Sequence, residues 1–198
     1  MTGFLAATAL SFAVIFVAEL GDKSQLMALT FATRFRALPV LLGIAAATAV
    51  THAVSVGVGY LLGAAIPTFW ISLVAAVAFV GFGLWTLRGD TLTDDEKSRA
   101  GGTSRSTFLT VGVVFFLAEL GDKTMLATIT LATQYPGASG VLGVWVGSTV
   151  GMVLADGLAI VLGRVLGRNL PERLIRVGAA VLFFAFAAWI AIEAFTGA

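Results

Sequence analysis

The hexapeptide AELGDK occupies residues 18–23, and the same six letters return at residues 118–123. Each copy places a glutamate, an aspartate and a lysine in apolar surroundings; the first lies between SFAVIFV and LMALTFAT. A charged side chain inside a membrane costs about 2.5–3.5 kcal/mol even on a lenient insertion scale. Ser and Thr would hold helices together at a lower cost, so the duplicated charges indicate a function.

The composition of the chain is that of an integral membrane protein. Its 198 residues are 59% hydrophobic and 12% charged, with a mean hydropathy of +1.00, whereas soluble domains are roughly 25% charged. The net charge of +1, without a basic stripe, gives no indication of nucleic-acid binding. The chain has no cysteine, which excludes disulfides, cysteine zinc sites and thiol catalysis.

The apolar stretches predict an all-α membrane protein with six transmembrane helices, at residues 4–33, 40–66, 69–87, 107–134, 140–163 and 173–195. All four prolines lie at junctions, where a missing N–H does no harm. The N-terminal segment lacks the basic region of a signal peptide and is expected to begin the first helix. The polar stretch 88–106 is expected to be a short cytoplasmic linker.

The two halves of the chain are copies of each other. Shifted by 100 positions, residues 16–33 are identical to residues 116–133 at 11 of 18 sites. This predicts two three-helix repeats, at 1–87 and 107–198. Because three spans carry the chain across the membrane, the second repeat must enter from the opposite side, which makes the repeats inverted.

The basic residues support this topology independently. Apart from the motif lysines, all of them fall on one side of a six-span arrangement, which the positive-inside rule makes cytoplasmic. They are Arg34, Arg36, Arg88, Lys97, Arg99, Arg105, Arg164, Arg168, Arg173 and Arg176. Both termini are therefore predicted to lie outside.

The motif side chains are expected to face the interior of the helix bundle. On one continuous helix, Glu19, Asp22 and Lys23 would share a face about 100° wide. The first predicted span is ~45 Å long at 1.5 Å per residue, against about 30 Å of hydrocarbon. It must therefore tilt strongly or break, and Gly21 is the expected point of breakage.

The motif carboxylates predict a cation site. In an inverted repeat, Glu19, Asp22, Glu119 and Asp122 would converge on the symmetry axis, where such transporters bind substrate. Oxygen ligands suit hard divalent cations, and four carboxylates with two lysines leave two negative charges for one such ion. Crowded carboxylates take up protons when the metal leaves, and this competition is enough to couple metal transport to protons.

Other polar residues have more than one assignment from sequence. Gln25 adjoins the motif and is a candidate oxygen ligand, although its repeat counterpart is Met125. His52 and Asp156 are candidates for proton relay or for completing the coordination shell, or they are only hydrogen-bonded between helices. The alternative for the motif itself is structural, with Glu19 and Lys23 paired four residues apart on one helix.

The paired motifs ELGDKS (19–24) and ELGDKT (119–124) resemble the E-x-G-D-[KR]-[ST] pattern of the Ca²⁺/Mn²⁺:H⁺ exchangers known from Golgi membranes. The resemblance covers the whole chain and implies that the acidic motif residues bind the transported ion, with Lys23, Lys123, Ser24 and Thr124 as accessory residues. The bacterial branch of the family is associated with manganese export. The resemblance thus implies exchange of Mn²⁺ or Ca²⁺ for protons, in a bacterial plasma membrane.

Two other classes remain open at this point. A passive divalent-cation channel would line its pore with the same carboxylates, and an intramembrane aspartyl protease also uses Gly-Asp on facing helices. A protease has no use for the added glutamates and lysines, so we expect a transporter without enzymatic activity or cofactor. The oligomeric state does not follow from the sequence.

Overall fold

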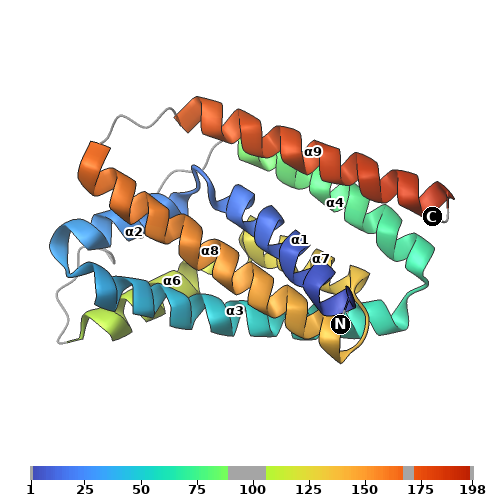
Figure 1. Ribbon diagram of the computed structural model, residues 1–198, viewed down its shortest axis with the longest axis horizontal. Coiled ribbons are helices and arrows are strands. Elements are labelled where there is room, and N and C mark those ends of the chain that lie inside the picture. The colour runs from blue at the N-terminus through green and yellow to red at the C-terminus, as the bar shows by residue number, and fades with distance from the viewer. Residues whose placement is uncertain (1, 89–105, 167–171, 197–198) are drawn as a thin grey trace.

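The computed structural model describes residues 2–88, 106–166 and 172–196, and these ranges contain eight helices and no strand (Figure 1). The helices are α1 (Thr2–Glu19), α2 (Lys23–Arg34), α3 (Ala37–Ala65), α4 (Thr68–Arg88), α6 (Thr107–Glu119), α7 (Lys123–Gln134), α8 (Ala138–Leu166) and α9 (Glu172–Thr196). The predicted all-α class is confirmed. The predicted linker lies almost entirely outside the described residues, as do Lys97, Arg99, Arg105 and Arg168.

The predicted spans 4–33 and 107–134 are not continuous helices. Each breaks inside the hexapeptide, and the axes of α1 and α2 differ by 72°. Gly21 and Gly121 occupy the breaks with φ of 77° and 78°, a left-handed conformation that glycine adopts without the steric cost of a Cβ. The shared face expected for one straight helix is therefore wrong, because a turn separates Glu19 from Lys23.

Four helices are long and apolar enough to cross a membrane in the described part of the chain. They are Ala37–Ala65, Phe69–Arg88, Ala138–Leu162 and Arg176–Thr196, and the bent pair Gly3–Glu19 with Lys23–Arg34 makes a fifth if it counts as one span. The apolar helix α6 has 13 residues, which is ~20 Å at 1.5 Å each and too short to cross alone. The structure thus supports four to five of the six predicted spans.

The helices of the two sequence halves pack against each other. Helices α1 and α2 contact α8, and their counterparts α6 and α7 contact α3. The third helices of the halves, α4 and α9, lie side by side along one edge of the molecule (Figure 1). The same contacts therefore occur twice with the halves exchanged, and each hexapeptide turn lies against a helix of the other half.

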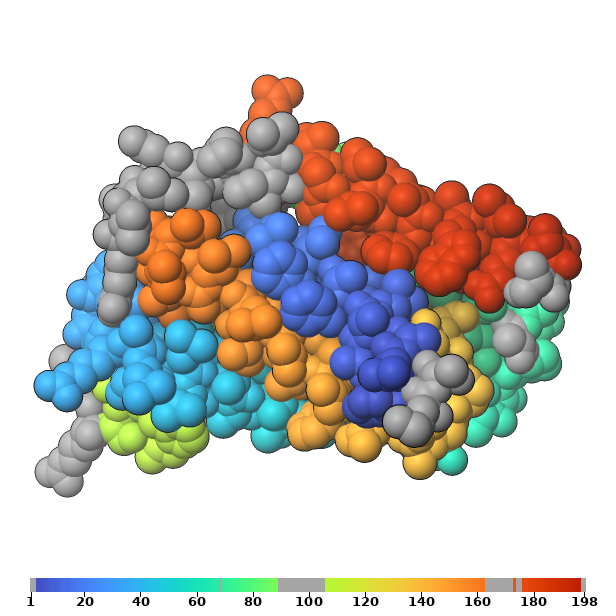
Figure 2. All heavy atoms as spheres, viewed as in Figure 1, coloured from blue at the N-terminus to red at the C-terminus, as the bar shows by residue number. Residues whose placement is uncertain are grey.

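Helix α8 approaches α1 closely through a line of glycines. A Cβ at Gly143, Gly147 or Gly151 would lie 2.6, 2.3 or 2.8 Å from a backbone oxygen of α1. The contacted oxygens belong to Phe4, Thr8 and Phe12, so the contact advances by four residues on both helices and the two run parallel. Figure 2 shows α1 and α8 adjoining on one face of the molecule. Small residues permit this close backbone approach, which fixes α8 relative to the first turn.

Candidate functional site

Each hexapeptide forms the turn between the two parts of a broken helix. The backbone N–H of Asp22 donates to the carbonyl of Glu19 (3.0 Å), and that of Asp122 donates to the carbonyl of Glu119 (3.2 Å). Both aspartates then occupy the N-cap position of the next helix, where a carboxylate is favoured by open N–H groups and the helix dipole. A glutamate ends one helix and an aspartate begins the next, so two carboxylates meet at each turn.

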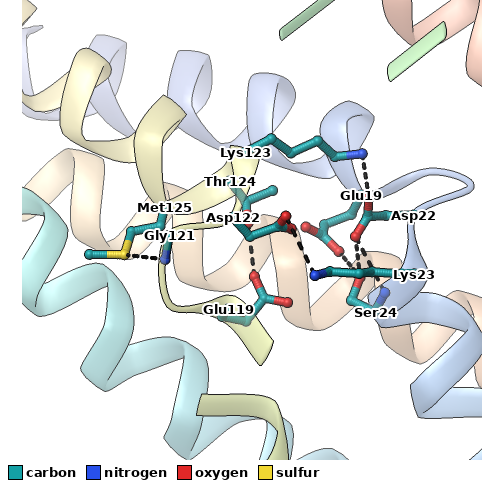
Figure 3. A network of polar contacts seen from close by, with 10 residues as sticks. All are labelled: Glu19, Asp22, Lys23, Ser24, Glu119, Gly121, Asp122, Lys123, Thr124 and Met125. Carbon is teal, nitrogen blue, oxygen red and sulfur yellow. Dashed lines mark hydrogen bonds and ion pairs between the residues drawn. The ribbon is translucent and has the colours of Figure 1, made fainter. Parts of the chain in front are cut away.

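The motif lysines pair across the two halves of the chain (Figure 3). Lys123 Nζ contacts Asp22 Oδ1, and Lys23 Nζ lies 3.8 Å from Asp122 Oδ1. The first pair is enclosed, whereas the Lys23 side chain is 19% exposed. The alternative pairing of Glu19 with Lys23 was expected on one continuous helix, and the turn between the two residues removes that geometry.

The two glutamates are held by hydroxyl groups of their own repeat. Ser24 Oγ donates to Glu19 Oε2, and Thr124 Oγ1 donates to Glu119 Oε2 at 2.9 Å. The other oxygen of each glutamate, Oε1, is buried and has no hydrogen-bond donor among the described residues. Each glutamate thus keeps one oxygen for another partner. This hydrogen bond to the glutamate explains why a hydroxyl residue, Ser24 or Thr124, directly follows the lysine in each repeat.

Gln25 and Met125 make the two turns chemically unequal. Gly21 N–H donates to Gln25 Oε1 (2.9 Å), whereas Gly121 N–H contacts Met125 Sδ (3.2 Å). The Gln25 amide also donates to the carbonyl of Ala155 on α8 (3.0 Å). The amide oxygen of Gln25 therefore accepts a hydrogen bond within the turn, and its amide nitrogen links that turn to α8. Sequence alone did not indicate this contact, although the Gln25–Met125 mismatch in the repeat alignment marked the position.

The motif side chains form one buried polar network (Figure 3). Of the eight polar motif side chains, only that of Lys23 is not buried. The seven buried ones are Glu19, Asp22, Ser24, Glu119, Asp122, Lys123 and Thr124. The ion pairs of Lys23 with Asp122 and of Lys123 with Asp22 show that the two turns meet. In the part of the chain that the structure describes, no three acidic or histidine side chains are close enough to hold a metal ion. The predicted motif residues therefore lie in one network in which each lysine contacts an aspartate of the other repeat.

The two remaining candidates lie on α3 and α8. His52 is buried, its Nδ1 lies 3.4 Å from Thr149 Oγ1, and it makes no hydrogen bond to a motif carboxylate among the described residues. Asp156 is fully buried on α8, directly after the residue that Gln25 contacts. Through the Ala155 carbonyl, α8 next to Asp156 is linked to the Gln25 side chain, which in turn accepts a hydrogen bond from Gly21 in the first turn. Asp156 therefore belongs to the neighbourhood of the motif, whereas His52 lies apart from it.

Buried carboxylates at two broken helices, inside a bundle of apolar helices, define the protein as a membrane transporter of cations. The comparison with protein families agrees. The model of the family described as "Divalent cation/proton antiporter GDT1" matches residues 7–94 and 107–198. The chain belongs to this family and is a divalent cation/proton antiporter, not an enzyme. Membership excludes the aspartyl protease alternative, and the match in two segments agrees with a duplicated chain.

Curated relatives extend over most of the chain. A protein of Vibrio cholerae named "Putative manganese exporter" is 34% identical over 90% of this chain and 87% of its own length. A chloroplastic GDT1-like protein of rice is 32% identical over 97% of this chain and 62% of its own length. A GDT1-like protein of Synechocystis is 28% identical over 88% of this chain and 91% of its own length. No solved structure gives a significant match.

Proposed function

We propose that this antiporter exports Mn²⁺ from the cytoplasm in exchange for protons, and that the transported ion binds between the two hexapeptide turns. Glu19, Asp22, Glu119 and Asp122 are the ligands in this proposal. The name of the Vibrio cholerae relative favours manganese and export. The absence of cysteine agrees with a hard divalent cation, because softer metals favour thiolates.

The reciprocal lysine–aspartate pairs carry this proposal. Each aspartate faces an ammonium group from the other repeat, so a cationic group already occupies the place where a divalent ion would bind. An incoming ion competes with Lys23 and Lys123 for the same aspartate oxygens. With the lysines retained nearby, one divalent ion balances the net charge of the four carboxylates, which limits the electrostatic cost of the loaded site.

Proton coupling follows from the crowding of these carboxylates. Four of them in one enclosed site repel one another, so they do not all remain ionised when the metal leaves. Protons then occupy oxygens that the metal needs, and metal binding expels them. Mutual exclusion lets the site change its access when loaded with either substrate. A passive channel lacks this requirement.

The proposal includes the membrane orientation. The contacts that recur with the halves exchanged support two inverted three-helix repeats, with α1–α2 and α6–α7 each acting as one broken span. The positive-inside rule then places the basic loops in the cytoplasm and both termini outside, in a bacterial plasma membrane. Broken helices that meet at a symmetry axis are a recurring way to build a transport site.

The experiment is metal flux in inside-out vesicles or proteoliposomes with an imposed proton gradient. We expect uphill Mn²⁺ accumulation that stops when an ionophore collapses the gradient, and Mn²⁺ affinity that weakens as pH falls. Flux indifferent to the gradient would support the channel instead. A panel that adds Ca²⁺ and Mg²⁺ would establish the preferred ion.

Amide variants test the ligands one at a time. Glu19→Gln, Asp22→Asn, Glu119→Gln and Asp122→Asn keep the shape of the side chain and remove its charge, so we expect each to weaken Mn²⁺ affinity about tenfold or more. The matched control is Glu193→Gln, the same change at an exposed position of α9. Full Mn²⁺ transport by all four variants would contradict the shared site.

A further inference from the structure

Asp156 is a buried carboxylate without a partner in the described part of the chain. Its exposure is 0%, and neither carboxylate oxygen has a hydrogen-bond partner among the described residues. No lysine or arginine pairs with it there, in contrast to the motif aspartates. An ionised carboxylate enclosed in this way is unfavourable unless a proton or a cation compensates its charge. Its surroundings indicate which group does so.

The packing of α8 places Asp156 level with the first turn. The glycine contacts advance by four residues on both helices, from Gly143 at Phe4 to Gly151 at Phe12 and Phe16. One further step along parallel helices brings α8 at Ala155 to the end of α1, where Glu19 lies. The hydrogen bond from the Gln25 side-chain amide to the Ala155 carbonyl independently places this part of α8 beside the first turn.

The oxygens of Asp156 that lack a hydrogen-bond donor have counterparts on the motif glutamates. Apart from the motif aspartates, which pair with lysines, three carboxylates have oxygens without a hydrogen-bond donor among the described residues: Oε1 of Glu19, Oε1 of Glu119 and both oxygens of Asp156. The motif aspartates meet the lysines, so these three carboxylates offer the oxygens that lysine does not cover.

We propose that Asp156 is a fifth carboxylate ligand of the transported cation. This rests on the proposed function and adds a residue from α8 that the hexapeptide pattern does not contain. Its counterpart in the first repeat is Val56, so the cation meets a carboxylate from only one of the two long central helices. The site is therefore asymmetric, with Gln25 and Asp156 on one side and Met125 and Val56 on the other.

The test is Mn²⁺ binding to the purified full-length protein in detergent, at fixed pH, for the wild type and three variants. We expect Asp156→Asn to raise the Kd for Mn²⁺ about tenfold or more, and Asp156→Glu to restore it to within about threefold. The control is Ser148→Ala, which removes another buried oxygen of α8 that has no hydrogen-bond partner among the described residues, and it should bind like the wild type.

Mn²⁺-dependent thermal stability gives a second readout. Mn²⁺ should raise the Tm of the wild type and of Asp156→Glu by mass action, and the rise should be smaller in Asp156→Asn. Wild-type Kd in Asp156→Asn, or failure of folded Asp156→Glu to bind Mn²⁺, would overturn the assignment of Asp156. Absence of Mn²⁺ binding by the wild type would instead overturn the proposed function, so the two failures are distinguishable.

Discussion

At the scale of single residues, the lysines and aspartates of the motif pair across the two repeats, whereas the glutamates accept hydrogen bonds from hydroxyl groups of their own repeat. The sequence predicted the candidate site residues, because a duplicated Glu-x-Gly-Asp-Lys in apolar surroundings is too costly to serve helix packing alone. It did not predict that Lys123 meets Asp22 and Lys23 meets Asp122. Sequence spacing describes neighbours on one helix, whereas these pairs depend on how two distant turns meet in the fold.

The unequal burial of the two lysines leads to a prediction about stability. Lys123→Gln should lower the free energy of unfolding by about 3–5 kcal/mol, because it leaves the buried Asp22 carboxylate without that ammonium. Lys23→Gln should cost less, because the Lys23 side chain is partly exposed and lies farther from its aspartate. Unfolding of the two variants in detergent measures the difference. Equal losses would contradict it.

At the scale of helices, two breaks and one line of glycines determine the site. The mismatch between helix length and membrane thickness led to the expectation that the first span tilts or breaks, and the break lies at Gly21, as expected. The shortness of α6, with 13 residues, was not evident from the sequence, since residues 107–134 read as one apolar stretch. Hydropathy gives the extent of a buried stretch but not the direction of its axis. That direction depends on a backbone turn.

The glycine at each break should be intolerant of a side chain. Gly121→Ala forces alanine into a left-handed conformation at φ 78°, which costs roughly 1–2 kcal/mol, although open space surrounds the new methyl group. The matched control is Gly57→Ala in the interior of α3, also with nothing within 4 Å, where alanine favours the helix by up to about 1 kcal/mol. We expect Tm to fall for the first and to be unchanged or higher for the second. A Tm for Gly121→Ala at or above that of the wild type would contradict the left-handed turn.

At the scale of the whole molecule, the two halves interlock. The repeat alignment predicted the duplication, but a chain of two copies can also fold as two separate bundles. The observed contacts of α1 with α8 and of α6 with α3 exclude that arrangement. Interlocking is favoured over two separate bundles by surface complementarity between helices, such as the glycines of α8 against α1. Hydropathy does not report this complementarity.

The absence of cysteine makes the proposed orientation directly measurable. Arg36→Cys and Ser139→Cys each introduce the only thiol of the chain at an exposed residue. A membrane-impermeant maleimide applied to intact cells should label the Ser139→Cys variant and leave the Arg36→Cys variant unlabelled until the membrane is opened. Labelling of both variants in intact cells, or of Arg36→Cys alone, would contradict inverted repeats with an outside N-terminus.

The exchange of lysines between the halves has a consequence for biogenesis. During synthesis, Asp22 and Lys23 enter the membrane about 100 residues before Lys123 and Asp122 exist. Until then Asp22 and Lys23 lack their cross-repeat partners, and each charge in the hydrocarbon costs about 2.5–3.5 kcal/mol. We therefore expect the first half to be an intermediate whose charged turn is kept out of the lipid by the insertion machinery. Its release as a stable product depends on the arrival of the second half, which couples completion of the chain to burial of its charges.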